Sequence, residues 1–165
     1  MADETLQNSH GSKESDGLNA TAIIAKIVEV VLAVFAVGLI VDPLNSFQRI
    51  HYTPRLKVDD IAIIYISLAG YIIINMLFLI GYLIGDRIPK KTSILFSAVG
   101  AVLHVVAGSV IVHNWRHLNG TYISISSNAI IASKQYLDML ISASFFAFLN
   151  AIVFVIDIFL TFKFE

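Results

Sequence analysis

The sequence predicts an all-α membrane protein whose fold is an antiparallel bundle of four transmembrane helices. Apolar residues make up 57% of the 165 residues, and the mean hydropathy of +0.79 exceeds what a soluble domain of this size can bury. Four stretches longer than about 18 residues run almost without charge, and a helix of that length crosses the hydrocarbon core of a bilayer. Four crossings place both termini on one side of the membrane.

The N-terminal segment differs in composition from the rest of the chain. Residues 1–19 are polar and of mixed charge, so they predict a disordered cytoplasmic tail. The four-helix transmembrane domain follows over residues 20–162. Its first span is expected over about 20–41, because Asp42-Pro43 should end it: proline lacks a backbone donor and disfavours helix at the residue before it.

A short charged turn connects the second and third spans. The second span is expected over about 61–84, after a polar outer loop at 42–60, and the turn occupies residues 85–91. A connection this short predicts an antiparallel hairpin with the third span, which is expected over about 92–112.

Residues 113–117 mark the expected exit of the third span, because they combine a tryptophan with basic groups suited to the headgroup region. A loop rich in Ser, Asn and Thr then runs from Leu118 to Lys134. The fourth span, about 136–162, is long enough to tilt in the bilayer. Residues 163–165 form a short cytoplasmic C-terminus.

Two features orient the chain with its termini in the cytoplasm. Three cations in the second loop, Arg87, Lys90 and Lys91, favour the cytoplasmic side for that loop. A sequon at Asn119 in the third loop is a candidate for N-glycosylation, which requires the extracellular or lumenal side. Chance occurrence of the sequon in a polar loop remains an alternative.

Polar residues within the spans are the candidate functional positions, because a polar group in hydrocarbon needs a partner. Lys26 and Glu29 share a helix face and can pair. We favour the interpretation that this first turn lies at the interface with Lys26 extending to the headgroups; an ion or proton site is the alternative. The six intramembrane polar residues expected to take part in packing are Lys26, Glu29, Asn75, His104, Asn150 and Asp157.

Small residues on the same helices predict close helix packing. In the fourth span, alanines at four-residue spacing lie on the face that carries Asn150 and Asp157. Asn150 can then bond to another helix, and Asp157 lies near the cytoplasmic end, where it could meet Lys26; the favoured role of this face is a structural helix contact. His104, between two glycines of the third span, is the candidate pH-sensitive group, although packing is the favoured role. The candidate packing residues are Gly81, Gly85, Gly100, Gly108, Ala143, Ala147 and Ala151.

Several functional classes are not expected. The chain has no cysteine, which excludes disulfides and thiolate chemistry. No nucleophile–base pair, metal-ligand cluster or phosphate-binding loop is found at workable spacing, so neither catalysis nor a cofactor nor a metal is predicted. The 11 Lys and Arg residues are scattered, which makes nucleic acid an unexpected partner.

The chain resembles MARVEL-like four-span proteins, and in particular the Snakeskin-like family of insect smooth septate junctions. The similarity covers about residues 20–162: an early Lys26, a tight basic second loop, a glycine-bearing third helix that ends near Trp115, and the segment Asn150–Asp157. The first outer loop, 42–60, departs from the family because it contains neither Gly nor Trp. The resemblance implies a multi-pass protein of the lateral plasma membrane that contacts lipids and other junctional membrane proteins, or a second copy of itself.

The implied function is structural: assembly of septate-type cell junctions and of the paracellular barrier in an epithelium. The alternatives are a MARVEL-like trafficking or vesicle protein and an ion or proton pathway built on His104, Glu29 and Asp157. For the structural function, outward contacts are expected from Tyr52, Arg55, Trp115 and Tyr122.

Overall fold

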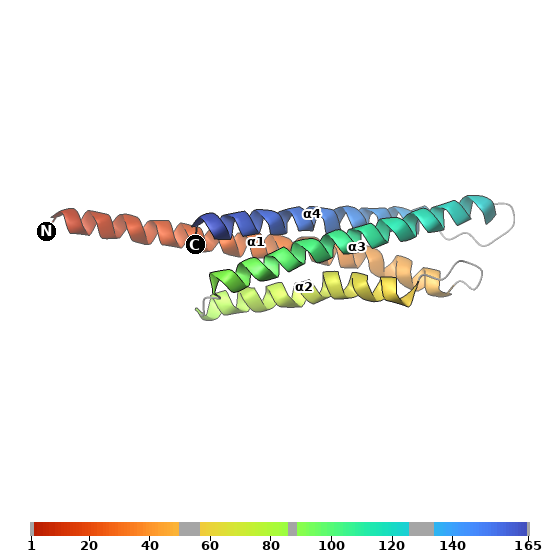
Figure 1. The fold of residues 1–165 in the computed structure, drawn as a ribbon, viewed down its shortest axis with the longest axis horizontal. Coiled ribbons are helices and arrows are strands. Elements are labelled where there is room, and N and C mark those ends of the chain that lie inside the picture. The colour runs from red at the N-terminus through yellow and green to blue at the C-terminus, as the bar shows by residue number, and fades with distance from the viewer. Residues whose placement is uncertain (1, 50–56, 86–88, 126–133, 165) are drawn as a thin grey trace.

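The chain folds into four long α-helices, shown by a computed structural model in Figure 1. The structure describes the backbone of residues 2–49, 57–85, 89–125 and 134–164, and side chains of 21, 23–45, 57–85, 89–119 and 134–163. These residues contain no strand. The helices are α1 (Ala2–Arg49), α2 (Val58–Ile84), α3 (Lys90–Ile125) and α4 (Lys134–Phe164).

The helices pack side by side in the cyclic order α1, α2, α3, α4. The end of α4, the end of α2 and the start of α3 lie at one end of the bundle, the end from which α1 projects toward the N-terminus (Figure 1). The start of α2, the end of α3 and the start of α4 lie toward the opposite end. Each helix contains a segment long and apolar enough to cross a membrane. These segments are Ile23–Asn45, Val58–Ile84, Lys90–Asn119 and Lys134–Lys163. The predicted fold class, an all-α four-helix membrane bundle, is confirmed.

Helix α1 is longer at both ends than predicted. Its backbone is helical from Ala2, so the predicted disordered tail at 1–19 does not match the structure. Once a helix is nucleated, each added residue gains a hydrogen bond. The helix also continues past Pro43 to Arg49, so the prediction that Asp42-Pro43 ends it was wrong. A proline removes one backbone bond, and this loss is tolerated where neighbouring helices pack on the helix, as the burial of Leu44 shows.

Helix α2 begins and ends with ordinary capping chemistry. Asp59 and Asp60 lie in its first turn, where negative charge interacts favourably with the helix dipole. Gly85 ends the helix in the left-handed region, with φ of 84°, and its N–H faces the carbonyls of Gly81 and Tyr82. Gly85 is exposed, and a Cβ added there would meet no atom within 4 Å. Its predicted role in helix packing was therefore wrong: it is a cap glycine.

Helix α3 runs well beyond the predicted exit of its span. It continues through residues 113–117 to Ile125, so the loop predicted from Leu118 was placed too early. Apolar packing supports the extension, since Leu118 and Leu137 of α4 are buried and Trp115 packs against the same cluster. Helices α3 and α4 therefore remain packed against each other beyond the predicted end of the third span.

At the opposite end of the bundle, Lys90 connects α3 to α4. Lys90, at the start of α3, donates from Nζ to the carbonyl oxygen of Phe162 at 3.2 Å. That carbonyl belongs to the last turn of α4, where backbone acceptors lack helical partners and a cation interacts favourably with the helix dipole. The Lys90 Nζ also lies 5.7 Å from the centre of the Phe162 ring.

The lateral faces of the bundle are covered by large apolar side chains. Ile66 and Ile73 of α2, Leu95 of α3 and Phe159 of α4 are all more than 60% exposed. Water would penalise such a surface, whereas lipid tails or another membrane protein would cover it without cost. The six intramembrane polar residues predicted to take part in packing lie instead in the interior, at most 1% exposed.

Candidate functional site

The interior of the bundle holds a cluster of polar residues from all four helices, in which hydrogen bonds connect α1, α3 and α4 and Asn75 of α2 lies alongside. It lies in the half of the bundle nearest the termini, and its charged members occupy the terminal parts of their spans. All of its members are at most 1% exposed except Gly100, whose carbonyl accepts one bond and whose residue is also buried. The members are Lys26, Glu29, Asn75, Ser97, Gly100, His104, Asn150 and Asp157.

Lys26 is the centre of the network. Its Nζ donates to Asp157 Oδ2 at 2.8 Å, to Glu29 Oε2 at 3.0 Å and to Ser97 Oγ at 3.0 Å. An ammonium group has three N–H donors, so every one of them is used. The rings of Phe78 and Phe154 complete the surroundings, with centres 5.4 and 5.5 Å from Nζ.

The favoured interpretation that Lys26 extends to the headgroups was therefore wrong. Its residue is only 1% exposed, and its side chain points across the bundle toward α3 and α4. Two carboxyl groups and a hydroxyl on three helices bind the ammonium more fully than one interfacial contact would, which decides the direction of the side chain.

Asp157 receives two strong hydrogen bonds on one oxygen. Besides the Lys26 bond, Ser97 Oγ donates to Asp157 Oδ2 at 2.6 Å. Bonds between a charged acceptor and a hydroxyl or ammonium donor are short and strong. Together they connect α1, α3 and α4 at one point of the interior, and the contact of Asp157 with Lys26 that the sequence left possible is present.

Glu29 is less fully bonded than Asp157. Its Oε2 accepts from Lys26, whereas its Oε1 has no hydrogen-bond partner although Glu29 is 0% exposed. Asn75 of α2 lies close enough to this carboxyl group to interact with it. Its side-chain nitrogen and oxygen are both buried, and neither forms a hydrogen bond of good geometry. Two buried polar groups thus face one another with unused bonding capacity.

Asn150 bridges α1 and α3, as expected from the sequence. Its Nδ2 donates to the backbone oxygen of Glu29 at 3.1 Å and lies 3.0 Å from His104 Nε2. A backbone carbonyl only accepts, which fixes the amide orientation and makes Nε2 the acceptor of the second bond. His104 Nδ1 then donates to the carbonyl of Gly100 at 2.8 Å. Both ring nitrogens of His104 are used, in the tautomer with hydrogen on Nδ1.

Aromatic rings pack around this histidine. The Tyr71 and Phe154 rings lie 5.6 and 4.9 Å from the His104 ring, centre to centre. The Tyr71 hydroxyl donates to the carbonyl of Phe96 at 3.0 Å, which fixes that ring against α3. A Cβ added at Gly100 would lie 2.6 Å from Tyr71 Cε1 and 2.9 Å from Phe154 Cε1. The Tyr71 and Phe154 rings thus occupy the space that a Cβ at position 100 would need.

The other predicted small residues pack in the bundle to different extents. Ala143, Ala147 and Ala151 are at most 5% exposed, and the first two belong to the main apolar core. A Cβ at Gly108 would lie 2.9 Å from Phe148 of α4, so this glycine also admits a ring. Gly81 is half-buried near the end of α2.

The far half of the interior is mostly apolar. Between Ser67 and Asn114 the axis is filled by a core that includes Ile40, Ile64 and Ile111. Ser144, also buried there, bonds to the carbonyl of Ile141 in its own helix at 2.6 Å. Among the residues that the structure describes, the polar network therefore extends from the terminal end to His104 and stops at an apolar core.

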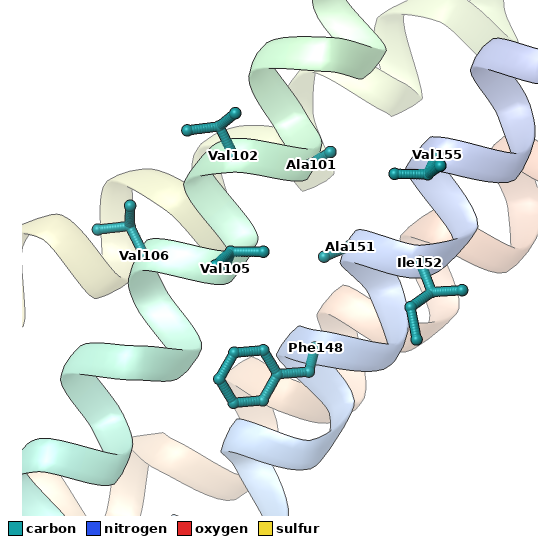
Figure 2. A pocket seen from close by; sticks show the side chains of 8 residues that line it. All are labelled: Ala101, Val102, Val105, Val106, Phe148, Ala151, Ile152 and Val155. Atoms are coloured by element: carbon teal, nitrogen blue, oxygen red, sulfur yellow. The ribbon is translucent and has the colours of Figure 1, made fainter.

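The lateral surface between α3 and α4 carries an open groove of about 530 Å³, whose lining is shown in Figure 2. Val102 and Ile152 on its rims are 62% and 57% exposed, and the rim faces outward at the level of the spans. The groove offers no polar atom, so it can make only dispersion contacts with lipid or protein. Its lining comprises Ala101, Val102, Val105, Val106, Phe148, Ala151, Ile152 and Val155.

Asn119, the candidate glycosylation residue, lies within α3 and is half-buried. Sequons that are used belong to accessible surface loops, whereas this one has helical backbone through Thr121. We expect enzymatic deglycosylation to leave the electrophoretic mobility of the wild-type protein unchanged. The matched control is Ile130→Thr, which completes a sequon at Asn128 beyond the end of α3. A mobility shift that Asn119→Gln removes would contradict the expectation.

Of the residues expected to make outward contacts, only Trp115 has a described side chain, and it is half-buried against the core. Tyr52 and Arg55 lie outside the described residues, as does the side chain of Tyr122. Ser97 was missed by sequence reasoning. It lies seven residues before His104, on the stripe of α3 that also carries Gly100, and this spacing was the available signal.

No family model, curated protein or solved structure matches this chain. In the described residues no group of three His, Cys, Asp or Glu side chains is placed to hold a metal ion. What the geometry itself offers is a buried ion network that joins helices, together with an apolar outer surface.

Proposed function

We propose that this four-span membrane protein is non-enzymatic and organises a membrane domain, as an assembly component of insect septate-type cell junctions and their paracellular barrier. The supporting observation is the division of the bundle: charged groups are used internally to join α1, α3 and α4, while the lateral faces are apolar. Such a body can associate with lipids, with other junctional proteins or with a second copy in the membrane plane. The resemblance to Snakeskin-like proteins supplies the junctional setting, with both termini in the cytoplasm and the chain in the plasma membrane.

The test is localisation of a tagged copy in a polarised insect epithelium, combined with tracer permeability after depletion of the protein. We expect lateral junctional staining and a leaky epithelium that the wild-type chain repairs. Intracellular puncta with an intact barrier would instead support the MARVEL-like trafficking alternative.

Rescue with two matched variants tests the outward end of the bundle. Arg116, exposed on the distal part of α3, and Lys91, exposed near the start of the same helix, each lose one cation as Arg116→Gln and Lys91→Gln. If the contacts that seal the barrier lie at the outward end, Arg116→Gln should rescue less well than Lys91→Gln at equal surface level. Equal rescue would place those contacts elsewhere.

An ion or proton pathway is the second candidate, because the polar network penetrates from one end of the bundle to His104. The apolar core beyond it opposes conduction. We therefore expect vesicles that contain the purified protein to show no proton flux above protein-free vesicles, and His104→Leu to leave this unchanged. A wild-type flux that His104→Leu abolishes would favour the pathway over the structural role.

A further inference from the structure

The charges of the interior network do not balance. It contains one ammonium group, on Lys26, and two carboxyl groups, on Glu29 and Asp157, and these three residues are 1%, 0% and 1% exposed. Both carboxyl groups pair with the same Nζ. If every group is ionised, the network holds one uncompensated negative charge in the interior of a membrane-spanning bundle.

An uncompensated charge in the interior costs several kcal/mol, because it has lost its hydration and the surrounding medium of low dielectric constant stabilises charge poorly. No second cation is at hand among the described side chains: the remaining Lys and Arg residues there are exposed or, for Lys90, half-buried at the end of the bundle. His104 does not supply the charge either, because its Nε2 accepts a hydrogen bond. The missing positive charge therefore does not come from any of the side chains that the structure describes.

The unused atoms show where that charge binds. Asp157 Oδ2 already accepts two hydrogen bonds, whereas Glu29 Oε1 has no partner. Beside it lies Asn75, 1% exposed and without a partner on either side-chain atom. No partner fixes which end of the Asn75 amide faces Glu29, so the amide can turn its oxygen toward the carboxyl group. An amide oxygen accepts the hydrogen of a carboxylic acid, so in that orientation Asn75 satisfies a protonated Glu29 and is satisfied by it.

We propose that Glu29 is a buried proton-binding site: one proton resides on its Oε1 and is shared with Asn75 Oδ1, which makes the network neutral. The titratable groups that face it are Lys26 on its own helix, Tyr71 on α2, His104 on α3 and Asp157 on α4. Tyr71 donates its hydroxyl hydrogen to the carbonyl of Phe96, and the other three are bonded as described above. Of the carboxyl oxygens in this group, Glu29 Oε1 is the one that is buried without a hydrogen-bond partner among the described residues, which makes it the position for the proton.

An alkali cation would supply the same charge but needs more ligands. Hard cations take several oxygen atoms as ligands, and the side-chain oxygens without a partner around Glu29 are its own Oε1, Asn75 Oδ1 and Asn150 Oδ1. A proton needs one donor and one acceptor atom, which Glu29 and Asn75 provide. The unpartnered atoms therefore favour the proton.

Infrared spectroscopy of the full chain in lipid nanodiscs tests this assignment. At neutral pH the wild-type protein should show the C=O stretching band of a buried protonated carboxylic acid. Glu29→Gln should lose the band. Asp157→Asn should lose it as well, because one ammonium and one carboxylate then balance and Glu29 can ionise. Asp138→Asn, at an exposed position of α4, should keep it and is the matched control.

Absence of the band from the folded wild-type protein would overturn the proposal, as would its persistence in Glu29→Gln. A melting temperature that rises when sodium replaces choline in the wild type, but not in Glu29→Gln, would assign the site to an alkali cation instead. If Glu29→Gln does not fold, Asn75→Leu decides: loss of the acceptor that shares the proton should shift the band, and a band that does not shift would place the proton elsewhere. The proton site follows from the charge count and is independent of the junctional function.

Discussion

Lys26→Met should destabilise the bundle more than any other single substitution considered for this chain, by about 3–5 kcal/mol in the free energy of unfolding. Methionine retains the length and apolar stem of the side chain but removes all three donors, so Glu29 and Asp157 lose their shared cation. Ser97 remains as the donor to Asp157. Two buried carboxyl groups must then each hold a proton or remain as unpaired charges, and the deficit should grow as pH rises.

The measurement is thermal unfolding of the purified protein in one detergent over a series of pH values. Lys57→Met is the matched control, since Lys57 is exposed before the first turn of α2 and makes no side-chain cap. It should melt like the wild type. If Lys26→Met also melts like the wild type, the ion network contributes little to the stability of the bundle and its role must be sought elsewhere.

The spans could be predicted from sequence because the bilayer imposes a simple rule. Backbone groups in hydrocarbon must bond within their own segment, so long uncharged stretches have to be helices. The ends of the helices could not be predicted in this way. Hydropathy indicates which residues can lie in lipid, but it does not indicate where the helical backbone ends. Helix α1 continues beyond Pro43 and α3 continues beyond Trp115, because packing against neighbouring helices supports both extensions.

Although the sequence had offered Asp157 as a possible partner, the inward direction of Lys26 was not the favoured prediction. Its pair with Glu29 is local, and the spacing predicted it. The two partners that turn it inward, Ser97 and Asp157, are 71 and 131 residues away in the chain. Only the assembled bundle brings them within bonding distance. The contact of Asn150 with another helix could be predicted, because an amide in the middle of a span must bond across to a neighbouring helix.

Gly100 gives the second large effect: Gly100→Ala should destabilise the bundle, with an overpacking cost of about 1–3 kcal/mol. The new methyl group would lie 2.6 Å from Tyr71 Cε1 and 2.9 Å from Phe154 Cε1. Neither ring can move easily, because the Tyr71 hydroxyl is bonded to the Phe96 carbonyl and the Phe154 ring packs on both Tyr71 and His104. The gain from alanine in a helix, about 1 kcal/mol, only partly offsets this.

The chain offers a matched control in Gly70→Ala, because no atom lies within 4 Å of a Cβ at Gly70. There only the helix propensity changes, so this variant should be as stable as the wild type or more so, and the two alanines should shift the melting temperature in opposite directions. Adding Tyr71→Phe to Gly100→Ala releases the ring from Phe96, so the double variant should lose less stability than the two single changes together. Additive losses would mean that the hydrogen bond does not hold the ring in place, and that the room left by Gly100 is not what positions Tyr71 and Phe154 around His104.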